Sequence, residues 1–586
     1  MDYIAFVSDS KKETMLNVAL GTTEPEREKT IDLNVGFNTE QRTWEIIVKH
    51  RGNMDYIREK YSTSRVIELI NNYAIIIAPE NDVESIVAEA NIDFAEKSKN
   101  YYFKTDVGKS AGCVNFLQVE PYNFFGQGVL VAILDSGIDI YHRDFQNPDG
   151  TTRIYELWDQ TITENQMPPE GYFYGRLYSQ EEINQAIAAG RVNGRNIVAT
   201  QDYSGHGTAV AGILAGNGAE SDGKYAGVAS RSTLLIVKLG DSNSSFPRTT
   251  RIMEGIDYAL KVAARINMPL VINLSFGNNY GSHNGKSLFE SFIDEASRYG
   301  KTTIVVGAGN EANALIHISG SLSVGREEIV ELNIAEYETK LNLQIWKNYV
   351  DDFDVIIETP NLERIGPLSK KSQVVRYSFY NNELIVYYGM PSPFEMQQEI
   401  YMDFIPRGNY ILSGIYKIHL IPKMIVSGNY NMWLPSNAVI NDKTGFAKSD
   451  PNGTFTIPST ARSVISVGAY NPSLDAYATF SGRGFLRSEY VNPTLVADGV
   501  DVTTTRVGGG YRTVTGTSFA TPFVSGGAAM LMEWGIVREN DVYLYGEKVK
   551  AYLMKGAKEI GGFAYYPNNM VGAGAMCVAL SLPVYK

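Results

Sequence analysis

Five apolar runs constrain the fold of this chain more than any other feature. Each is rich in β-branched residues and ends in glycine or a small polar residue: "GVLVAILDSG", "TLLIVKLG", "PLVINLSFG", "TTIVVGAGN" and "SVISVGAY". Helix-like segments such as "RIMEGIDYALKVAARI" fall between the runs. Strands buried on both faces have this composition, and their alternation with helices is typical of a parallel sheet covered on both sides. We therefore expect an α/β fold built on a mainly parallel sheet.

Two segments depart from this pattern. The first hundred residues read as a small α+β unit, with strand-like runs such as "TWEIIVKH" and "VIELINNYAIIIAP" and helix candidates between them. Between about 314 and 455 the strands are short, alternating and rich in aromatic residues, which predicts an inserted antiparallel sandwich or jelly roll. The expected domains are 1–103, an N-terminal segment with the small α+β unit; 104–313, the first part of the α/β domain; 314–455, the insertion; and 456–586, the second part.

Composition argues against several classes of protein. The chain has 586 residues and a net charge of −13, which disfavours a nucleic-acid partner or an anionic membrane surface. No apolar run reaches the roughly 20 residues of a membrane span, and the N-terminus lacks the pattern of a secretory signal. The only cysteines, Cys113 and Cys577, are too few for a disulfide framework or a Cys-based zinc site. We expect an intracellular protein, although a protein exported without a signal peptide would have the same sequence features.

Four polar residues stand at element ends of the predicted sheet. Asp135 ends one strand and Asn310 follows another, while His206 and Ser518 each precede a helix rich in small residues. Singly, each has an ordinary explanation: a turn, a helix cap or local packing. Ligands of such sheets bind where the strands reach their carboxyl ends, so the four side chains should gather there. An acid, a base, an amide donor and a hydroxyl together predict nucleophilic catalysis.

The surrounding motifs resemble a known family. "VAILDSGID", "SGHGTAVAG" and "GTSFATPFVSG" are similar to the Asp, His and Ser signatures of subtilisin-like serine proteases, and "NLSFG" and "VVGAGNE" to their substrate-binding strand and oxyanion segment. The resemblance covers about 104–560 apart from the insertion. Ala209 and Phe519 replace a common His and a common Met, and neither position takes part in the proton chemistry. The implied site consists of the catalytic residues Asp135, His206 and Ser518; the oxyanion donor Asn310; the substrate strand Ser275, Phe276 and Gly277; and the pocket residues Ala308 and Gly309.

The remaining segments narrow the resemblance. Residues 43–103 resemble the family's propeptide, a chaperone and inhibitor whose tail occupies the cleft. Together with the insertion and the lack of a signal, this combination resembles the Csp-type proteases of spore-forming clostridia, which activate a cortex-degrading hydrolase during germination. The resemblance implies a cytoplasmic or spore-associated serine endopeptidase that cuts itself between about Ser98 and Lys104. Its partners would be its own prodomain and a protein substrate such as a cortex hydrolase zymogen. A catalytically silent germination regulator and a general cytosolic subtilase remain as alternatives.

No cofactor is expected. Subtilisin-like proteins often hold structural Ca²⁺ in surface loops, and "NGAESDGKY" (217–225) offers Glu220 and Asp222 as oxygen ligands. A solvated loop explains this segment equally well, so we expect no metal there. The six histidines are scattered without zinc spacing.

Overall fold

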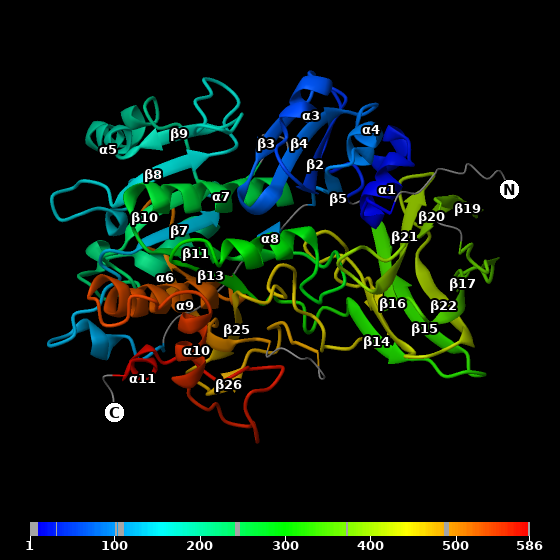
Figure 1. The fold of residues 1–586 in the computed structure, drawn as a ribbon. Coiled ribbons are helices and arrows are strands. Elements are labelled where there is room, and N and C mark those ends of the chain that lie inside the picture. Colours follow the sequence, from blue (N-terminus) through cyan, green and yellow to red (C-terminus); the bar gives the residue numbers. More distant parts are fainter. Residues whose placement is uncertain are drawn as a thin grey trace. The chain divides into compact units, whose positions relative to one another are not determined.

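The computed structural model of the chain describes residues 10–30, 32–99, 102–103, 111–240, 247–370, 373–485 and 492–583. Its contacts divide the chain into two compact units (Figure 1). The first unit comprises Met1–Asn100, Asn278–Leu288 and Glu311–Ile457, and the second comprises Tyr101–Gly277, Phe289–Asn310 and Pro458–Lys586.

A nine-stranded, mainly parallel sheet forms the centre of the second unit, as the sequence predicted. Its order is β26-β25-β13-β11-β7-β10-β8-β9, with β27 paired to β25, and only β9 and β26 run antiparallel to their neighbours. The strands are β7 (Leu130–Asp135), β8 (Ile154–Asp159), β9 (Arg176–Ser179), β10 (Thr233–Lys238), β11 (Leu270–Leu274), β13 (Thr302–Gly307), β25 (Ile465–Asn471), β26 (Ala476–Tyr477) and β27 (Leu495–Asp498).

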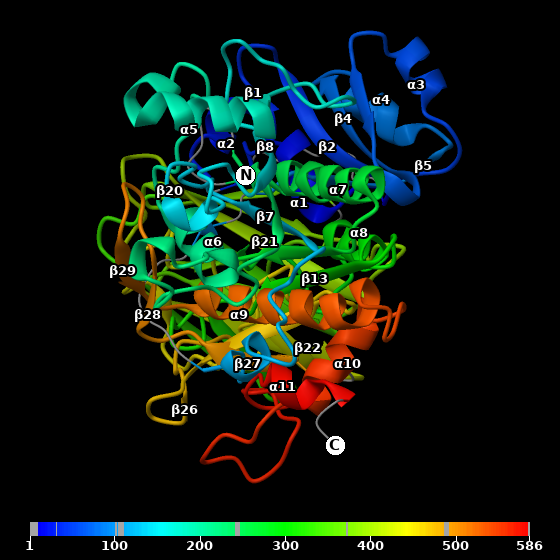
Figure 2. The same cartoon turned by 90° about the vertical axis from the view of Figure 1, so that its left-hand side faces the viewer.

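Helices cover both faces of this sheet. Figures 1 and 2 show α6 (His206–Ala215) and α9 (Thr517–Met532) on one face, and α7 (Thr249–Ile266) and α8 (Leu288–Ala296) on the other. Val131 and Ile133 of β7 share a core with residues of α6 and α9, whereas Leu134 lies against Gly255 of α7. Successive strand residues point to opposite faces, so a strand buried on both faces must be apolar throughout.

The second unit contains further short elements and one disulfide. Cys113 and Cys577 are bonded to each other with their Cα atoms 4.9 Å apart, a pairing that the sequence analysis did not foresee. The other elements include β6 (Tyr102–Phe103), β12 (Phe276–Gly277), the hairpin β28 (Val502–Thr505) and β29 (Tyr511–Val514), and the helices α5 (Gln180–Gly194), α10 (Glu547–Lys555) and α11 (Val578–Ser581).

The N-terminal part of the first unit is a five-stranded antiparallel sheet with short helices. The apolar run at 66–79 divides into two strands because Asn71 and Asn72 adopt left-handed backbone angles between them, which asparagine tolerates. The elements are α1 (Thr14–Leu20), α2 (Glu24–Arg27), β1 (Phe37–Asn38), β2 (Thr43–His50), α3 (Asp55–Lys60), β3 (Arg65–Glu68), β4 (Tyr73–Pro79), α4 (Val83–Ala88) and β5 (Ile92–Lys97).

Two further antiparallel sheets occupy the inserted segment, with the orders β14-β23-β16-β21-β20-β19 and β18-β17-β22-β15-β24. Apolar side chains from both sheets, including Leu343, Met402 and Leu420, form one core. The strands are β14 (His317–Ser321), β15 (Glu328–Ile334), β16 (Leu341–Asn348), β17 (Asp352–Glu358), β18 (Arg364–Ile365), β19 (Val375–Phe379), β20 (Asn382–Tyr388), β21 (Gln397–Pro406), β22 (Gly414–Met424), β23 (Asn429–Trp433) and β24 (Gly445–Phe446).

The outer face of β20 and β21 packs against the N-terminal segment. Ile385 and Tyr401 belong to the same buried cluster as Met15 and Leu16 of α1. Their immediate neighbours Leu384, Ile400 and Met402 point into the core between the two sheets. Strands β20 and β21 are therefore buried on both faces, which is uncommon for an antiparallel sheet.

Neighbouring positions on β20 provide a test of this double burial. Ile385→Ala and Leu384→Ala each remove a fully buried side chain, at a cost of about 2–5 kcal/mol. Because the two side chains face different cores, Ile385→Ala should speed amide hydrogen exchange in α1 by at least about tenfold, and Leu384→Ala should act mainly on β15 and β22. Exchange measured by mass spectrometry on both variants checks this. An α1 that exchanges at the parent rate in Ile385→Ala contradicts the packing.

Candidate active site

The end of β7 and the start of α6 bring together two of the predicted residues. The Nδ1 atom of His206 lies 2.7 Å from an Oδ1 atom of Asp135, and both side chains are buried. Gly207 makes the approach possible, because a Cβ atom at that position would lie 2.1 Å from the carbonyl oxygen of Gly137. The glycine after the histidine is thus a packing requirement of this site.

Burial and two carboxylates set the pKa of His206. Burial lowers it, but the charge and hydrogen bond of Asp135 and the charge of Asp202 outweigh burial, so the pKa of His206 is raised above its ordinary value. The positive charge of Arg512 acts in the lowering direction.

Asp202 is a part of the site that the sequence analysis missed. Its Oδ1 atom accepts hydrogen bonds from the Ser136 hydroxyl and the Gly205 N–H, both at 2.8 Å. Its Oδ2 atom accepts from the N–H and the hydroxyl of Thr208 at 2.9 and 2.7 Å. Asp202 therefore ties the turn after β7 to the first turn of α6. An acidic residue just before a helix that lacks another cap was the available signal, in "DYSGHG".

Ser518 is the second residue of α9. The N-cap position is Gly516, so Ser518 does not cap this helix. Its hydroxyl donates to the carbonyl oxygen of Ser275 at 3.0 Å, and the side chain is buried. The ring of the next residue, Phe519, has its centroid 5.2 Å from that of His206. The residue that follows Ser518 in α9 is therefore in ring contact with His206, and a direct bond between the serine and the histidine stays a prediction.

Asn310 is held against the start of α9. Its Oδ1 atom accepts from the N–H and the hydroxyl of Thr517 at 2.9 and 3.0 Å. The Nδ2 atom lies over Gly516, where a Cβ atom would approach it to 3.3 Å and where the backbone φ of 147° also requires glycine. With its oxygen engaged, the Asn310 side chain can offer only its N–H groups to a ligand near Ser518.

The pocket residues predicted from the resemblance follow β13 directly. The Ala308 N–H donates to the carbonyl oxygen of Val467 at 2.9 Å, and the Gly309 N–H donates to the Thr517 hydroxyl at 3.1 Å. These bonds fix the backbone between β25 and α9. A role in substrate selection stays a prediction.

The predicted substrate strand is already paired with another part of the chain. In β12, Phe276 and Gly277 pair antiparallel with Phe103 and Tyr102 of β6. Ser275, which precedes β12, donates its hydroxyl to the Ser518 carbonyl oxygen at 3.0 Å. The edge next to Ser518 therefore accepts an extended peptide backbone.

The loop considered for calcium is bonded to its own chain. Glu220 accepts hydrogen bonds from the N–H groups of Arg143 and Gly510 at 3.2 and 2.6 Å. Within the described ranges, no group of three or more acidic, His or Cys side chains has an arrangement that could hold a metal ion. Among the same residues, no helix is long and apolar enough to cross a membrane.

Comparisons with known proteins cover most of the chain. The model of the Csp protease B prodomain matches residues 10–99, and the model of the subtilase family matches residues 126–410 and 424–574. The structure of the CspB protease of Clostridium perfringens aligns with a TM-score of 0.74 and 36% identity, covering 80% of this chain and 95% of that one.

The curated relatives are matched over only part of their own length. The major intracellular serine protease of Bacillus subtilis is 31% identical over 218 residues, which is 34% of this chain and 53% of that protein. The PI-type proteinase of Lactococcus lactis subsp. cremoris is 21% identical over 512 residues, 80% of this chain and 26% of that protein. The matches thus span between a quarter and about half of these relatives' length. With the family model matching both segments of the α/β unit, the chain belongs to the subtilase family.

Proposed function

We propose that the chain is a serine endopeptidase in which Ser518 attacks a peptide carbonyl, His206 accepts its proton and Asp135 orients the imidazole. The 2.7 Å contact between Asp135 and His206 beside the start of α9 carries this proposal. The hydroxyl now donates to the Ser275 carbonyl oxygen and must turn toward Nε2 of His206 for reaction. Such catalytic hydrogen bonds often form only when substrate is bound.

Negative charge that develops on the substrate oxygen needs hydrogen-bond donors. The backbone N–H of Ser518 and the side-chain N–H groups of Asn310 are the donors that this site offers. In subtilisin, loss of the equivalent side-chain donor costs about 100- to 1000-fold in turnover. His206 then returns the proton to the leaving amine, so the reaction needs no external acid.

Substrate recognition would use the backbone of Ser275, Phe276 and Gly277. Their pairing with residues 102–103 supports the addition of an extended peptide as a strand at this edge. Side chains of the substrate then alternate between the two sides, and one of them would enter the pocket next to Ala308 and Gly309.

Replacing Ser518 tests the nucleophile. Ser518→Ala removes one oxygen atom and should lower hydrolysis of an unstructured protein such as casein by at least about a thousandfold. Ser525→Ala is the matched control, since Ser525 is a buried serine of the same helix whose hydroxyl donates to Asn273. The control should keep most of the activity. Comparable hydrolysis by Ser518→Ala and the parent would refute the assignment.

We also propose that the enzyme cuts its own chain after Lys104. Residues 103 and 102 lie opposite Phe276 and Gly277. The residue before Phe276 is Ser275, whose carbonyl oxygen accepts a hydrogen bond from the Ser518 hydroxyl, so we expect the cut one residue beyond the paired Phe103. The range expected from the sequence, Ser98 to Lys104, includes positions outside the described residues. The pairing of residues 102 and 103 favours the bond at the C-terminal end of that range.

N-terminal sequencing and intact mass test this register. The purified parent should show a large fragment that begins at Thr105, and Ser518→Ala should remain one chain. Cleavage at another bond would contradict the proposed cleavage position but not autoprocessing itself. An uncut parent that is indistinguishable from Ser518→Ala would contradict autoprocessing.

The match of residues 10–99 to the Csp protease B prodomain supports a narrower role. We propose that the substrate is the precursor of a spore-cortex hydrolase and that the chain acts during germination. A catalytically silent regulator is the alternative, and a fluorophosphonate probe separates the two because it labels only an activated serine. Expression timing separates the germination role from that of a general cytosolic subtilase.

Asp202 and Arg512 predict opposite changes in the pH profile of kcat/KM. Asp202→Asn removes a negative charge that raises the pKa of His206, so the acidic limb should move to lower pH by up to about one unit. Arg512→Gln removes a positive charge that lowers this pKa, so the limb should move to higher pH. A purely structural disturbance would reduce the plateau and leave the limb in place. If the acidic limbs of both variants lie at the same pH as that of the parent, Asp202 and Arg512 have no electrostatic effect on His206.

A further inference from the structure

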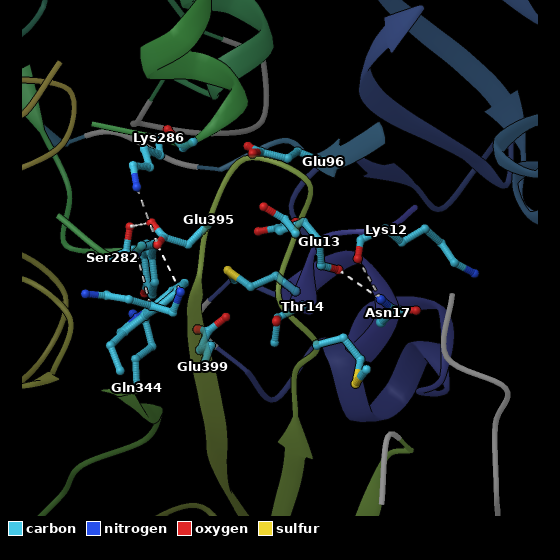
Figure 3. Close-up of a pocket in the computed structure, with 18 of the residues that line it drawn as sticks. Lys12, Glu13, Thr14, Asn17, Glu96, Ser282, Lys286, Gln344, Glu395 and Glu399 are labelled. Carbon is cyan, nitrogen blue, oxygen red and sulfur yellow. Dashed lines mark hydrogen bonds and ion pairs between the residues drawn. The ribbon is translucent and has the colours of Figure 1, made fainter. Parts of the chain in front are cut away.

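A cavity of about 80 Å³ lies in the first unit, next to α1 (Figure 3). Its walls come from α1, β5, the segment 278–288 and strands β16, β20 and β21. Ser10 and Met390 line it and are exposed, so the cavity can be reached from solvent. The volume admits about five or six water-sized atoms.

Aromatic and thioether side chains form much of the wall. They are Met15, Phe94, Tyr280, Trp346, Tyr387 and Met390. Aromatic faces attract cations electrostatically, and several of them around one site are typical of sites for organic ammonium ions. The wall therefore favours a cation that also has apolar surface.

The lysines of the cavity wall form ion pairs with all but one of the wall's carboxylates. Lys12 is paired with Glu84, and Lys99 lies 3.0 Å from Glu13 and 3.5 Å from Glu96. Lys286 lies 4.0 Å from Glu395.

Glu399 of β21 is the wall carboxylate that these lysines do not pair. It is 5% exposed and forms no ion pair with the residues that the structure describes. Figure 3 shows Glu399 and Thr14 among the side chains that line the cavity.

The surroundings of Glu399 oppose its ionisation. Burial and the charge of Glu13 raise its pKa to about 8, while the hydrogen bond of Thr14 and the charge of Lys99 act in the lowering direction. Near neutral pH the carboxyl group therefore holds a proton. A bound cation would displace that proton and pair with the ionised Glu399, which has no lysine partner among the described residues.

We propose that this cavity binds a small organic ammonium ion, with Glu399 as its counter-ion and the aromatic wall around its apolar part. A metal ion fits less well, because it would need several oxygen ligands and Glu399 is the one carboxylate not already paired with a lysine. An anion is disfavoured because each lysine of the wall already faces a glutamate. The proposal does not depend on the peptidase assignment. The ligand would join α1 to β21, two elements of the same unit.

Isothermal titration calorimetry of the full-length chain tests the proposal. The probes are methylammonium, ethylammonium and tetramethylammonium chloride, with potassium chloride as the ionic-strength control. Ligands of so few atoms bind at best in the micromolar to millimolar range, so titrations extend to about 50 mM. At least one of the amines should bind saturably with a stoichiometry near one, and potassium should not.

Two variants locate the site. Glu399→Gln keeps the shape of the side chain but removes its charge, so it should weaken binding by at least about tenfold. Asp403→Asn is the matched control: it is a fully buried acid of the same strand, four residues further on and outside the cavity wall. The control should bind within about twofold of the parent.

The pH dependence gives a second readout. Below about pH 8 a proton must leave Glu399 before the cation binds, so the affinity of the parent should fall by up to about tenfold per unit as pH decreases. This slope should vanish in Glu399→Gln. Absence of saturable binding in the parent, equal affinities of the parent and Glu399→Gln, or equal losses in both variants would each overturn the proposal.

Discussion

The close contact between the end of β7 and the first turn of α6 is the constraint on which the candidate active site depends. Asp135 and His206 can meet at 2.7 Å only because Gly207 lets the helix lie against the turn after the strand. Asp202 fastens this junction through four hydrogen bonds to the turn and the helix. The sheet supplies the rigidity, since β7 is central and buried on both faces. A site held by strands and helices in this way loses little precision to loop motion.

Local pattern was sufficient to predict much of this arrangement. The parallel sheet follows from the apolar runs, because only strands covered on both sides lack polar alternation. The grouping of Asp135, His206, Asn310 and Ser518 follows from their places at element ends, and the structure brings these residues together around the start of α9. Each of these inferences uses residues that are neighbours in sequence or ends of parallel strands.

Features that depend on distant partners were not visible. The role of Asp202 rests on hydrogen bonds to Ser136 as well as to its own loop, and the disulfide joins residues 464 positions apart. In β20 and β21 the sequence shows apolar residues without saying which face meets which partner. The importance of Glu399 likewise appears only when the lysines around it are assigned to other carboxylates.

The disulfide turns most of the second unit and the whole inserted segment into one closed covalent loop. Cys113 lies near the start of the α/β unit and Cys577 at the N-cap of α11, so the bridge encloses every residue between them. A single break of the backbone anywhere in that loop opens the ring but separates nothing, because the two pieces remain linked through sulfur. For a cut between positions 113 and 577, backbone cleavage and release of a fragment are therefore different events, and the fragment is covalently freed only when the bridge is reduced.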